Sequence, residues 1–163
     1  MEGLLAGQTA IVTGGAQGIG RCLAQRVASL GANVCVADID LSRAHDTAGQ
    51  FQASGYSAMA VCCDITSRED TEKMAAAVLA RFGSIDILIN NAGLFPIKLF
   101  GDMSEEEWKR VIDINLTGTF LATKAVYETM MNQGHGKVIN IASAAGRVGG
   151  VGLVHYSAAK AGV

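Results

Sequence analysis

A glycine-rich turn, Thr13-Gly14-Gly15-Ala16-Gln17-Gly18-Ile19-Gly20, separates an apolar run from a segment with helical periodicity. The glycines let the chain turn tightly and let backbone N–H groups approach an anion without a Cβ in the way. The N-terminus of the helix that follows adds unpaired donors and a partial positive charge. The turn therefore predicts a pyrophosphate site. Its spacing is G-x-x-x-G-x-G instead of the common G-x-G-x-x-G, and a tight turn without a ligand is the alternative.

Five apolar runs along the chain are expected to be strands. They are Thr9–Thr13, Asn33–Asp38, Ser57–Asp64, Asp86–Asn90 and Lys137–Ala142. Each is almost continuously hydrophobic, which is typical of parallel strands covered by helices on both faces. Segments with helical periodicity lie between them, at Gly18–Leu30, Leu41–Ala53, Ser67–Phe82 and Ser104–Gln133. Strict alternation predicts an α/β fold, a doubly wound, Rossmann-like parallel sheet with strand order 3-2-1-4-5.

The expected helices carry terminal signals. Gly31, Gly83 and Gly134 follow three of them, where a left-handed residue ends a helix. Ser104 and Glu107 have the spacing of a capping box at the start of the last long helix. A further helix is expected to begin near His155. No role is expected for this histidine, because its side chain would project about 100° away from that of the next residue on a helix.

Composition excludes several classes of protein. The 163 residues are 50% hydrophobic and 17% charged, which is enough to build a core and excludes a disordered chain. A net charge of −2 argues against a nucleic-acid partner. No apolar run reaches the ~18–20 residues that span a bilayer, so no membrane association is expected. The length and the absence of a linker predict a single domain over residues 1–163.

The cysteines and the N-terminal segment indicate a cytoplasmic protein. The first basic residue is Arg21, inside the first structural unit, so no secretory signal is expected. The four cysteines form no C-x-x-C pair, and with three histidines they give no metal-ligand spacing. We expect them to be small apolar core residues in a reducing compartment, and no metal is expected. A redox or metal role for Cys62–Cys63 is the alternative.

Asp38 closes the second expected strand, 18 positions after Gly20. A carboxylate there can accept hydrogen bonds from both ribose hydroxyls of an adenosine and repels a 2′-phosphate. The sequence therefore favours NAD over NADP. Arg43 is the nearest candidate to bind such a phosphate, and we expect it to face solvent on the next helix. The alternative for Asp38 is a turn residue at the end of a strand.

Three motifs together carry a resemblance to a known family. With Thr13–Gly20, Asn90-Asn91-Ala92-Gly93 and Tyr156-Ser157-Ala158-Ala159-Lys160, the chain resembles the short-chain dehydrogenase/reductase family over essentially its whole length. The resemblance implies an NAD(P)-dependent oxidoreductase. It also implies cofactor contacts from Gly14, Gln17, Gly18, Ile19, Gly20, Asp38, Asp64, Ile65, Asn91, Tyr156 and Lys160. For Asp64 the alternative is a turn that precedes a helix.

Tyr156 and Lys160 are four residues apart, so they share one face of a helix. A phenol with a pKa of ~10 is a poor base at neutral pH, but a nearby ammonium stabilises the phenolate. The resemblance implies that Tyr156 exchanges the proton on the substrate oxygen. It also implies that Lys160 lowers the pKa of Tyr156 and binds the nicotinamide ribose.

Ser143 and Asn115 complete the expected catalytic set. Ser143 precedes Tyr156 by 13 residues, and the resemblance implies that it donates a hydrogen bond to the substrate oxygen. The alternatives are an ordinary turn serine at this position and Ser157 in its place. For Asn115 the resemblance implies a bound water that links Lys160 to solvent.

Asn115 falls on a helical stripe that is expected to face the core. The stripe consists of Trp108, Val111, Ile112, Asn115 and Thr119. A buried asparagine needs hydrogen-bond partners. A helix irregularity beside Gly118 could provide them, and this interpretation is compatible with a catalytic role.

The substrate is less defined than the chemistry. Residues 94–103 and 144–153 are apolar and glycine-rich, which favours a small hydrophobic secondary alcohol or ketone. A 3-oxoacyl thioester on a carrier protein is the second hypothesis, and a sugar or polyol is the third. By analogy with the family, a homo-oligomer, either a dimer or a tetramer, is expected.

A hypothesis from another class concerns the length. Members of the family usually continue past the tyrosine-containing helix with further strands and helices, whereas this sequence stops at Val163. The chain is therefore expected to lack the family's C-terminal strands and helices. We then expect an open edge and exposed apolar surface on the fifth strand. The alternative function is a nucleotide-binding fragment without catalytic activity.

Overall fold

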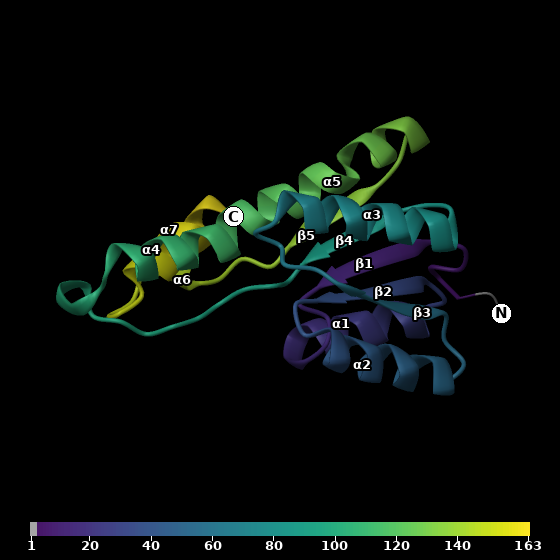
Figure 1. Cartoon of the computed structure of the whole chain (residues 1–163), viewed down its shortest axis with the longest axis horizontal. Helices are drawn as coiled ribbons and strands as arrows, with labels where there is room; N and C mark the ends of the chain where they lie inside the picture. Colours follow the sequence, from purple (N-terminus) through teal and green to yellow (C-terminus); the bar gives the residue numbers. More distant parts are fainter. Residues whose placement is uncertain (1–2) are drawn as a thin grey trace.

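The computed structural model describes residues 3–163, which contain one five-stranded parallel sheet (Figure 1). The strands are β1 (Thr9–Thr13), β2 (Asn33–Asp38), β3 (Ala58–Cys62), β4 (Ile87–Asn90) and β5 (Lys137–Asn140). Their order is β3-β2-β1-β4-β5, and every pairing is parallel. This is the doubly wound, Rossmann-like order predicted from the alternation of strands and helices.

Helices cover both faces of the sheet (Figure 1). They are α1 (Gly18–Ser29), α2 (Leu41–Ala53), α3 (Arg68–Phe82), α4 (Glu105–Ile112), α5 (Gly118–Gln133), α6 (Ala145–Val148) and α7 (Val154–Gly162), with a 3-10 turn η1 (Phe100–Asp102) and a π-helical turn η2 (Asp113–Thr117). One face is covered by α1 and α2 and the other by α3 and α5, while α4, α6 and α7 lie beyond the carboxyl ends of the strands. No helix in the described range is long and apolar enough to cross a membrane.

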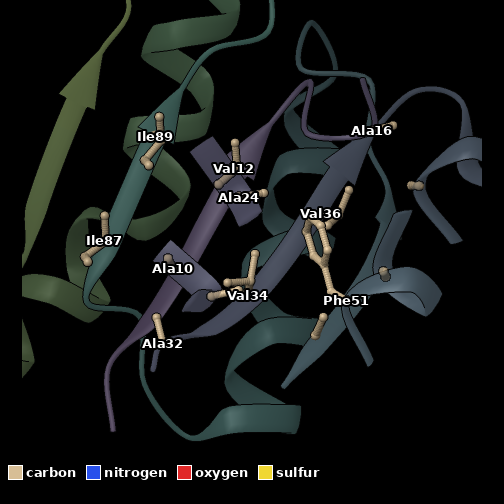
Figure 2. Packing of buried hydrophobic residues seen from close by; sticks show 14 residues of the cluster. Ala10, Val12, Ala16, Ala24, Ala32, Val34, Val36, Phe51, Ile87 and Ile89 are labelled. Carbon is tan, nitrogen blue, oxygen red and sulfur yellow. The ribbon is translucent and has the colours of Figure 1, made fainter. Parts of the chain in front are cut away.

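The core has two halves because side chains alternate across a strand. In β1, Ala10 and Val12 pack toward α1 and α2, where Phe51 of α2 is 3% exposed (Figure 2). Ile11, between them, packs on the opposite face with Met74 of α3. Because helices cover both faces, every residue of β1 is buried, including the threonines at its two ends.

The predicted helix ends are confirmed. Gly83 and Gly134 adopt φ of +83° and +74° at the ends of α3 and α5, and Gly31 adopts +97° just after α1. Ser104 and Glu107 form the capping box of α4, with the Ser104 N–H donating to Glu107 Oε2 at 2.8 Å and the Glu107 N–H donating to Ser104 Oγ at 3.2 Å.

The segment Ser104–Gln133 is helical as predicted, from Glu105 onward, and the π-helical turn η2 separates α4 from α5 within it. Asn115 lies in this π-helical turn, and its Nδ2 donates to the Val111 carbonyl at 3.0 Å. The side chain thereby takes the acceptor that the Asn115 backbone N–H would use in an α-helix. An irregularity beside Gly118 was expected as one way to satisfy this asparagine, and it is confirmed.

Two expectations about burial are wrong. Trp108 is 36% exposed, although Val111 and Asn115 of the same stripe are buried. Cys22 and Cys62 are exposed. Cys22 lies on the solvent side of α1, and Cys62 is the last residue of the edge strand β3. Cys35 and Cys63 are buried as expected, and burial raises the pKa of Cys63 to about 12.

The β5 strand forms one edge of the sheet and is exposed along its whole length. Val138 and Ile139 are 40% and 47% exposed, respectively. This agrees with the open, partly apolar edge expected for the fifth strand.

Candidate dinucleotide-binding and catalytic site

A groove of about 420 Å³ lies at the carboxyl ends of the central strands. Its lining includes most of the residues predicted to contact a cofactor: Gly14, Gln17, Ile19, Gly20, Asp38, Asp64, Ile65 and Asn91. Arg110 of α4 and Ile114 of η2 also line it, and no local pattern predicted either residue. The groove therefore lies at the switch point between β1 and β4, where open α/β sheets bind ligands.

The glycine turn is shaped by close backbone approaches. A Cβ on Gly20 would lie 2.1 Å from the Gly14 carbonyl oxygen, and one on Gly14, where φ is +61°, would lie 2.9 Å from Ala92 Cα. Gly18, with φ +54°, faces open space. Gln17 is the N-cap of α1 and makes no side-chain cap hydrogen bond, so its side chain occupies none of the first-turn N–H groups. These features fit a bound pyrophosphate.

Asn91 joins the glycine turn to the end of β4. Its backbone N–H donates to Thr13 Oγ1 at 3.1 Å, and its Nδ2 donates to the Thr13 and Gly14 carbonyls at 3.0 and 3.1 Å. Asn91 therefore positions the turn, in addition to lining the groove.

Asp38 is held by backbone amides on both sides. Its Oδ2 accepts from the Ala16 N–H and its Oδ1 from the Asp40 N–H, both at 3.1 Å. Arg43 is exposed on α2, as expected, and its guanidinium also contacts two neighbouring side chains. The Arg43 Nη1 hydrogen-bonds Gln17 Oε1, and its Nε lies 3.5 Å from Asp40 Oδ2.

Asp64 and Ile65 lie at the far side of the groove. Asp64 Oδ1 accepts from the backbone N–H and the hydroxyl of Thr66, at 2.9 and 2.7 Å, which is the turn expected before α3. Ile65 is buried against Gly118, where a Cβ would lie 2.6 Å from Ile65 Cδ1. Both residues line the groove, and both also shape the chain around it.

Tyr156 and Lys160 come together on α7, as their spacing predicted. Lys160 Nζ lies 5.9 Å from the centre of the Tyr156 ring and donates to the Ile141 carbonyl at 2.7 Å. Lys160 is 7% exposed, and burial lowers its pKa. Since Ile141 directly follows β5, the lysine connects α7 to the end of that strand.

Ser143 lies two residues after Ile141, at the start of α6. Its Oγ accepts from the Ala145 N–H at 3.2 Å, and within residues 3–163 no hydrogen bond joins it to Tyr156. Ser157 Oγ, the weaker alternative, is buried without a partner in the same range. The fold therefore places Ser143 beside the carbonyl that holds Lys160, with its hydroxyl hydrogen available for donation.

Asn115 is fully buried and clamps the segment after β4. Its Nδ2 donates to the Leu94 carbonyl at 2.9 Å, and its Oδ1 accepts from the Leu94 N–H at 3.3 Å. Its backbone carbonyl accepts from the Thr119 hydroxyl at 3.0 Å. These bonds make Asn115 a positioning residue for the loop after β4, residues 94–103, which contacts Tyr156 through Phe95.

Two contacts of that loop could not be predicted from sequence. The Phe95 ring meets Tyr156 edge-to-face, with the ring centres 4.7 Å apart. The Lys98 N–H donates to the Gly152 carbonyl at 2.9 Å, joining the two apolar loops. Both contacts connect segments more than fifty residues apart, and no local pattern encodes them.

The described residues contain no group of three or more His, Cys, Asp or Glu side chains placed to hold a metal ion. The fold, the glycine turn at the switch point and the Tyr156–Lys160 helix define a Rossmann-like protein of the class that binds dinucleotides. The family model described as short chain dehydrogenase matches residues 8–163, and the chain belongs to this family.

Known relatives agree with this assignment. The chain is 42% identical over 160 residues to a 3-oxoacyl-[acyl-carrier-protein] reductase of Synechocystis sp., covering 98% of this chain and 65% of the relative. It is 40% identical over 156 residues to the (2S)-[(R)-hydroxy(phenyl)methyl]succinyl-CoA dehydrogenase subunit BbsD of Thauera aromatica, covering 96% and 62%. The crystal structure of gox2181 superposes with a TM-score of 0.93 at 32% identity, covering 97% of this chain and 63% of that one. The chain thus spans less than two thirds of the length of each.

Proposed function

We propose that the chain binds NAD in the groove and interconverts a secondary alcohol and a ketone. The observation that carries this proposal is the placement of Lys160 Nζ 5.9 Å from the Tyr156 ring. This ring contacts Phe95, the residue after Leu94, which lines the same groove as Asp38. Residues 1–163 then act as a single dinucleotide-binding domain. Four free cysteines support a reducing, cytoplasmic location.

The protein residues handle the proton and the orientation of the substrate. Lys160, held by the Ile141 carbonyl, places an ammonium beside Tyr156 and stabilises its phenolate, so that Tyr156 can take or return the proton on the substrate oxygen. Ser143 donates a hydrogen bond to the same oxygen as charge develops on it. A bound nicotinamide supplies the hydride acceptor or donor.

The cofactor contacts follow from the lining of the groove. Gly14, Gly18 and Gly20 admit the pyrophosphate, while Asp38 accepts from the adenosine ribose and disfavours a 2′-phosphate. Asp64 and Ile65 border the adenine. Asn91 lies where the dinucleotide crosses the switch point.

The loops around Tyr156 favour a hydrophobic substrate. Phe95, Ile97 and Leu99 are exposed on one loop, and Val148 and Val151 are exposed on the other. The name of the Thauera aromatica relative describes a benzylic carbinol, which supports an aryl or alkyl carbinol as the substrate class. The name of the Synechocystis sp. relative supports a second candidate, reduction of a 3-oxoacyl thioester on a carrier protein.

We propose a homo-oligomer, a dimer or a tetramer, as the assembled form. Phe120, Tyr127 and Met131 of α5 are between 50% and 62% exposed, which supports a covered surface along this helix.

Binding and turnover test the proposal separately. NADH and NADPH are titrated into the purified chain with the fluorescence of Trp108, the single tryptophan, as the signal. We expect saturable NADH binding, followed by NADH-dependent reduction of an aryl or alkyl ketone in a panel that includes 3-oxoacyl thioesters and ketoses. Binding without turnover on any ketone would support a nucleotide-binding module instead. Absence of dinucleotide binding would contradict the proposal as a whole.

A further inference from the structure

A phenylalanine side chain lies against the phenol that is proposed to transfer the proton. The Phe95 ring meets the Tyr156 ring edge-to-face, with the ring centres 4.7 Å apart and the ring planes inclined by 79°. Phe95 is nevertheless 57% exposed. More than half of this apolar residue is therefore uncovered, directly beside Tyr156.

The loop that carries Phe95 is anchored on both sides of it. On one side, the Leu94 N–H donates to Asn115 Oδ1 at 3.3 Å, and Asn115 Nδ2 donates to the Leu94 carbonyl at 2.9 Å. On the other side, the Lys98 N–H donates to the Gly152 carbonyl at 2.9 Å. A ring held in this way is already in position, so a ligand that contacts it loses little affinity to the ordering of the loop.

The uncovered part of Phe95 favours an apolar ligand group. The two residues that follow it, Pro96 and Ile97, are apolar. The first charge on the loop, Lys98, is already paired with Glu107, with Nζ 3.1 Å from Oε1. A substituent that packs on Phe95 therefore gains most from burying apolar surface.

An aromatic substituent gains more from this ring than a saturated one of the same size. Aromatic rings attract one another in edge-to-face or offset arrangements with centres about 4.5–7 Å apart, and this attraction adds to the burial of surface. The carbon that bears the substrate oxygen must lie about 3–4 Å from the Tyr156 oxygen for proton transfer. A ring bonded to that carbon can therefore reach Phe95 at these separations.

We propose that Phe95 is a specificity-determining residue that binds an aryl group on the carbinol or carbonyl carbon of the substrate. The chain then prefers aryl ketones over saturated ketones of the same size. The inference rests on the proposed function and deepens it by naming the substrate class. Phe95 itself takes no part in the transfer of the proton or the hydride.

The test compares two ketones that differ only in the saturation of one ring, acetophenone and cyclohexyl methyl ketone. Values of kcat and KM at saturating NADH are measured for the wild-type chain, Phe95→Leu and Phe95→Tyr. The first variant removes the aromatic ring and keeps an apolar side chain, whereas the second keeps the ring. Comparing the kcat/KM ratio of the two ketones between variants cancels their different intrinsic reactivities. Far-UV circular dichroism reports whether each variant is folded.

Phe100 provides the matched control on the same loop. It is 75% exposed and lies in η1. There it lines a separate hollow with Met103 and Trp108, and neither Phe95 nor Tyr156 lines this hollow. Phe100→Leu is therefore the same substitution at an exposed ring that does not contact the phenol.

We expect Phe95→Leu to lower the kcat/KM ratio of acetophenone to cyclohexyl methyl ketone about three- to tenfold, chiefly through a higher KM for acetophenone. Phe95→Tyr and Phe100→Leu should keep this ratio within about twofold of wild type. A purely structural role of Phe95 in placing Tyr156 would instead lower kcat for both ketones by the same factor.

Binding without turnover is measured on the NADH-loaded chain by titration calorimetry. The ligands are 1-phenylethanol and 1-cyclohexylethanol, which do not react in this complex because NADH cannot accept a hydride from an alcohol. We expect Phe95→Leu to change the ratio of the two dissociation constants in the same direction, by about three- to tenfold.

The outcomes separate this inference from the proposed function. If the wild-type chain binds no NADH, or binds NADH but neither alcohol and reduces neither ketone, both are overturned. If it binds NADH and the alcohols but reduces neither ketone, the proposed turnover is overturned and the calorimetric ratio decides the inference. If it reduces ketones, the inference alone is overturned when Phe95→Leu leaves the ratio unchanged, when it lowers both ketones equally, or when Phe95→Tyr or Phe100→Leu has the same effect.

Discussion

Lys160 Nζ donates a 2.7 Å hydrogen bond to the carbonyl oxygen of Ile141 and lies 5.9 Å from the centre of the Tyr156 ring. One ammonium thereby connects the end of β5 to the helix that carries the phenol. Burial lowers the pKa of Lys160, and the Ile141 carbonyl is the hydrogen-bond acceptor for its ammonium beside Tyr156.

Replacing Lys160 with methionine should lower turnover at least about 100-fold, because the phenolate loses its neighbouring cation. Alcohol oxidation at saturating NAD, measured from pH 6 to 10, is the assay, because the phenolate acts as the base in this direction. The variant's residual activity should increase with pH as the unassisted phenol ionises. Lys73→Met removes a lysine from an exposed ion pair with Glu69 and should behave as wild type. Full activity in Lys160→Met would refute this role.

Replacing Asn115 with aspartate should lower the free energy of unfolding by about 3 kcal/mol. The substitution preserves shape but places an oxygen against the Leu94 and Val111 carbonyls, which now accept from Nδ2. Urea unfolding followed by circular dichroism gives the value. The matched control is Asn132→Asp, at an exposed position of α5, which should change stability by less than about 0.5 kcal/mol. Equal stability of the two variants would contradict the clamp.

Replacing Gly20 with alanine should weaken NADH binding at least about tenfold, because its Cβ would lie 2.1 Å from the Gly14 carbonyl oxygen and force the turn to move. Fluorescence titration with NADH measures the effect. Gly49→Ala provides the comparison: its Cβ meets nothing within 4 Å on α2, so it should keep wild-type affinity and stabilise the chain by about 0.5–1 kcal/mol. An unchanged affinity in Gly20→Ala would argue against the turn as the binding site.

The ionisation of Asp86 should make the free energy of unfolding depend on pH in the acidic range. Burial raises its pKa, but hydrogen bonds from Ser84 Oγ, the Thr9 N–H and His135 outweigh this and hold the pKa below the ordinary 3.8. The unfolded chain therefore takes up the proton first as pH falls. The contribution of this carboxylate to the free energy of unfolding is complete above the pKa that Asp86 has in the unfolded chain. It is lost as the pH falls through the lower pKa that Asp86 has in the folded chain.

Asp86→Asn should accordingly be less stable than wild type by about 1–3 kcal/mol at pH 7, and the difference should shrink below pH 4. Urea unfolding at pH 7, 5, 4 and 3 measures it. Asp46→Asn, at an exposed position of α2, should keep the wild-type pH dependence. A difference that is constant across these pH values would rule out the lowered pKa.

Local signals predicted the scaffold, and the family resemblance implied most of the residues that line the groove. The strand order follows from the alternation of buried strands and helices, the glycine turn directly follows the expected strand β1, and Asp38 closes the expected strand β2. The start of α4 could be predicted because Ser104 and Glu107 lie within one helical turn and form a reciprocal pair of hydrogen bonds, a capping box. These features depend on residues that are close in sequence or on general rules of topology.

The contacts that could not be predicted are long-range ones. An irregularity at Asn115 was expected, but its partner Leu94, twenty-one residues away, was not. Arg43 returns to Gln17, and Phe95 meets Tyr156, only because the fold brings those segments together. His155 is fully buried, and neither of its ring nitrogens has a partner within residues 3–163; its position next to Tyr156 on the helix did not predict this.

The central claim is that Tyr156 transfers the proton while the groove binds the dinucleotide independently of it. The direct test is Tyr156→Phe, which removes one oxygen and keeps the ring that meets Phe95. Ketone reduction and the NADH dissociation constant are measured on the same preparation. We predict that turnover falls at least about 100-fold while the dissociation constant changes less than about threefold. Turnover that persists at the wild-type rate in Tyr156→Phe would contradict the account.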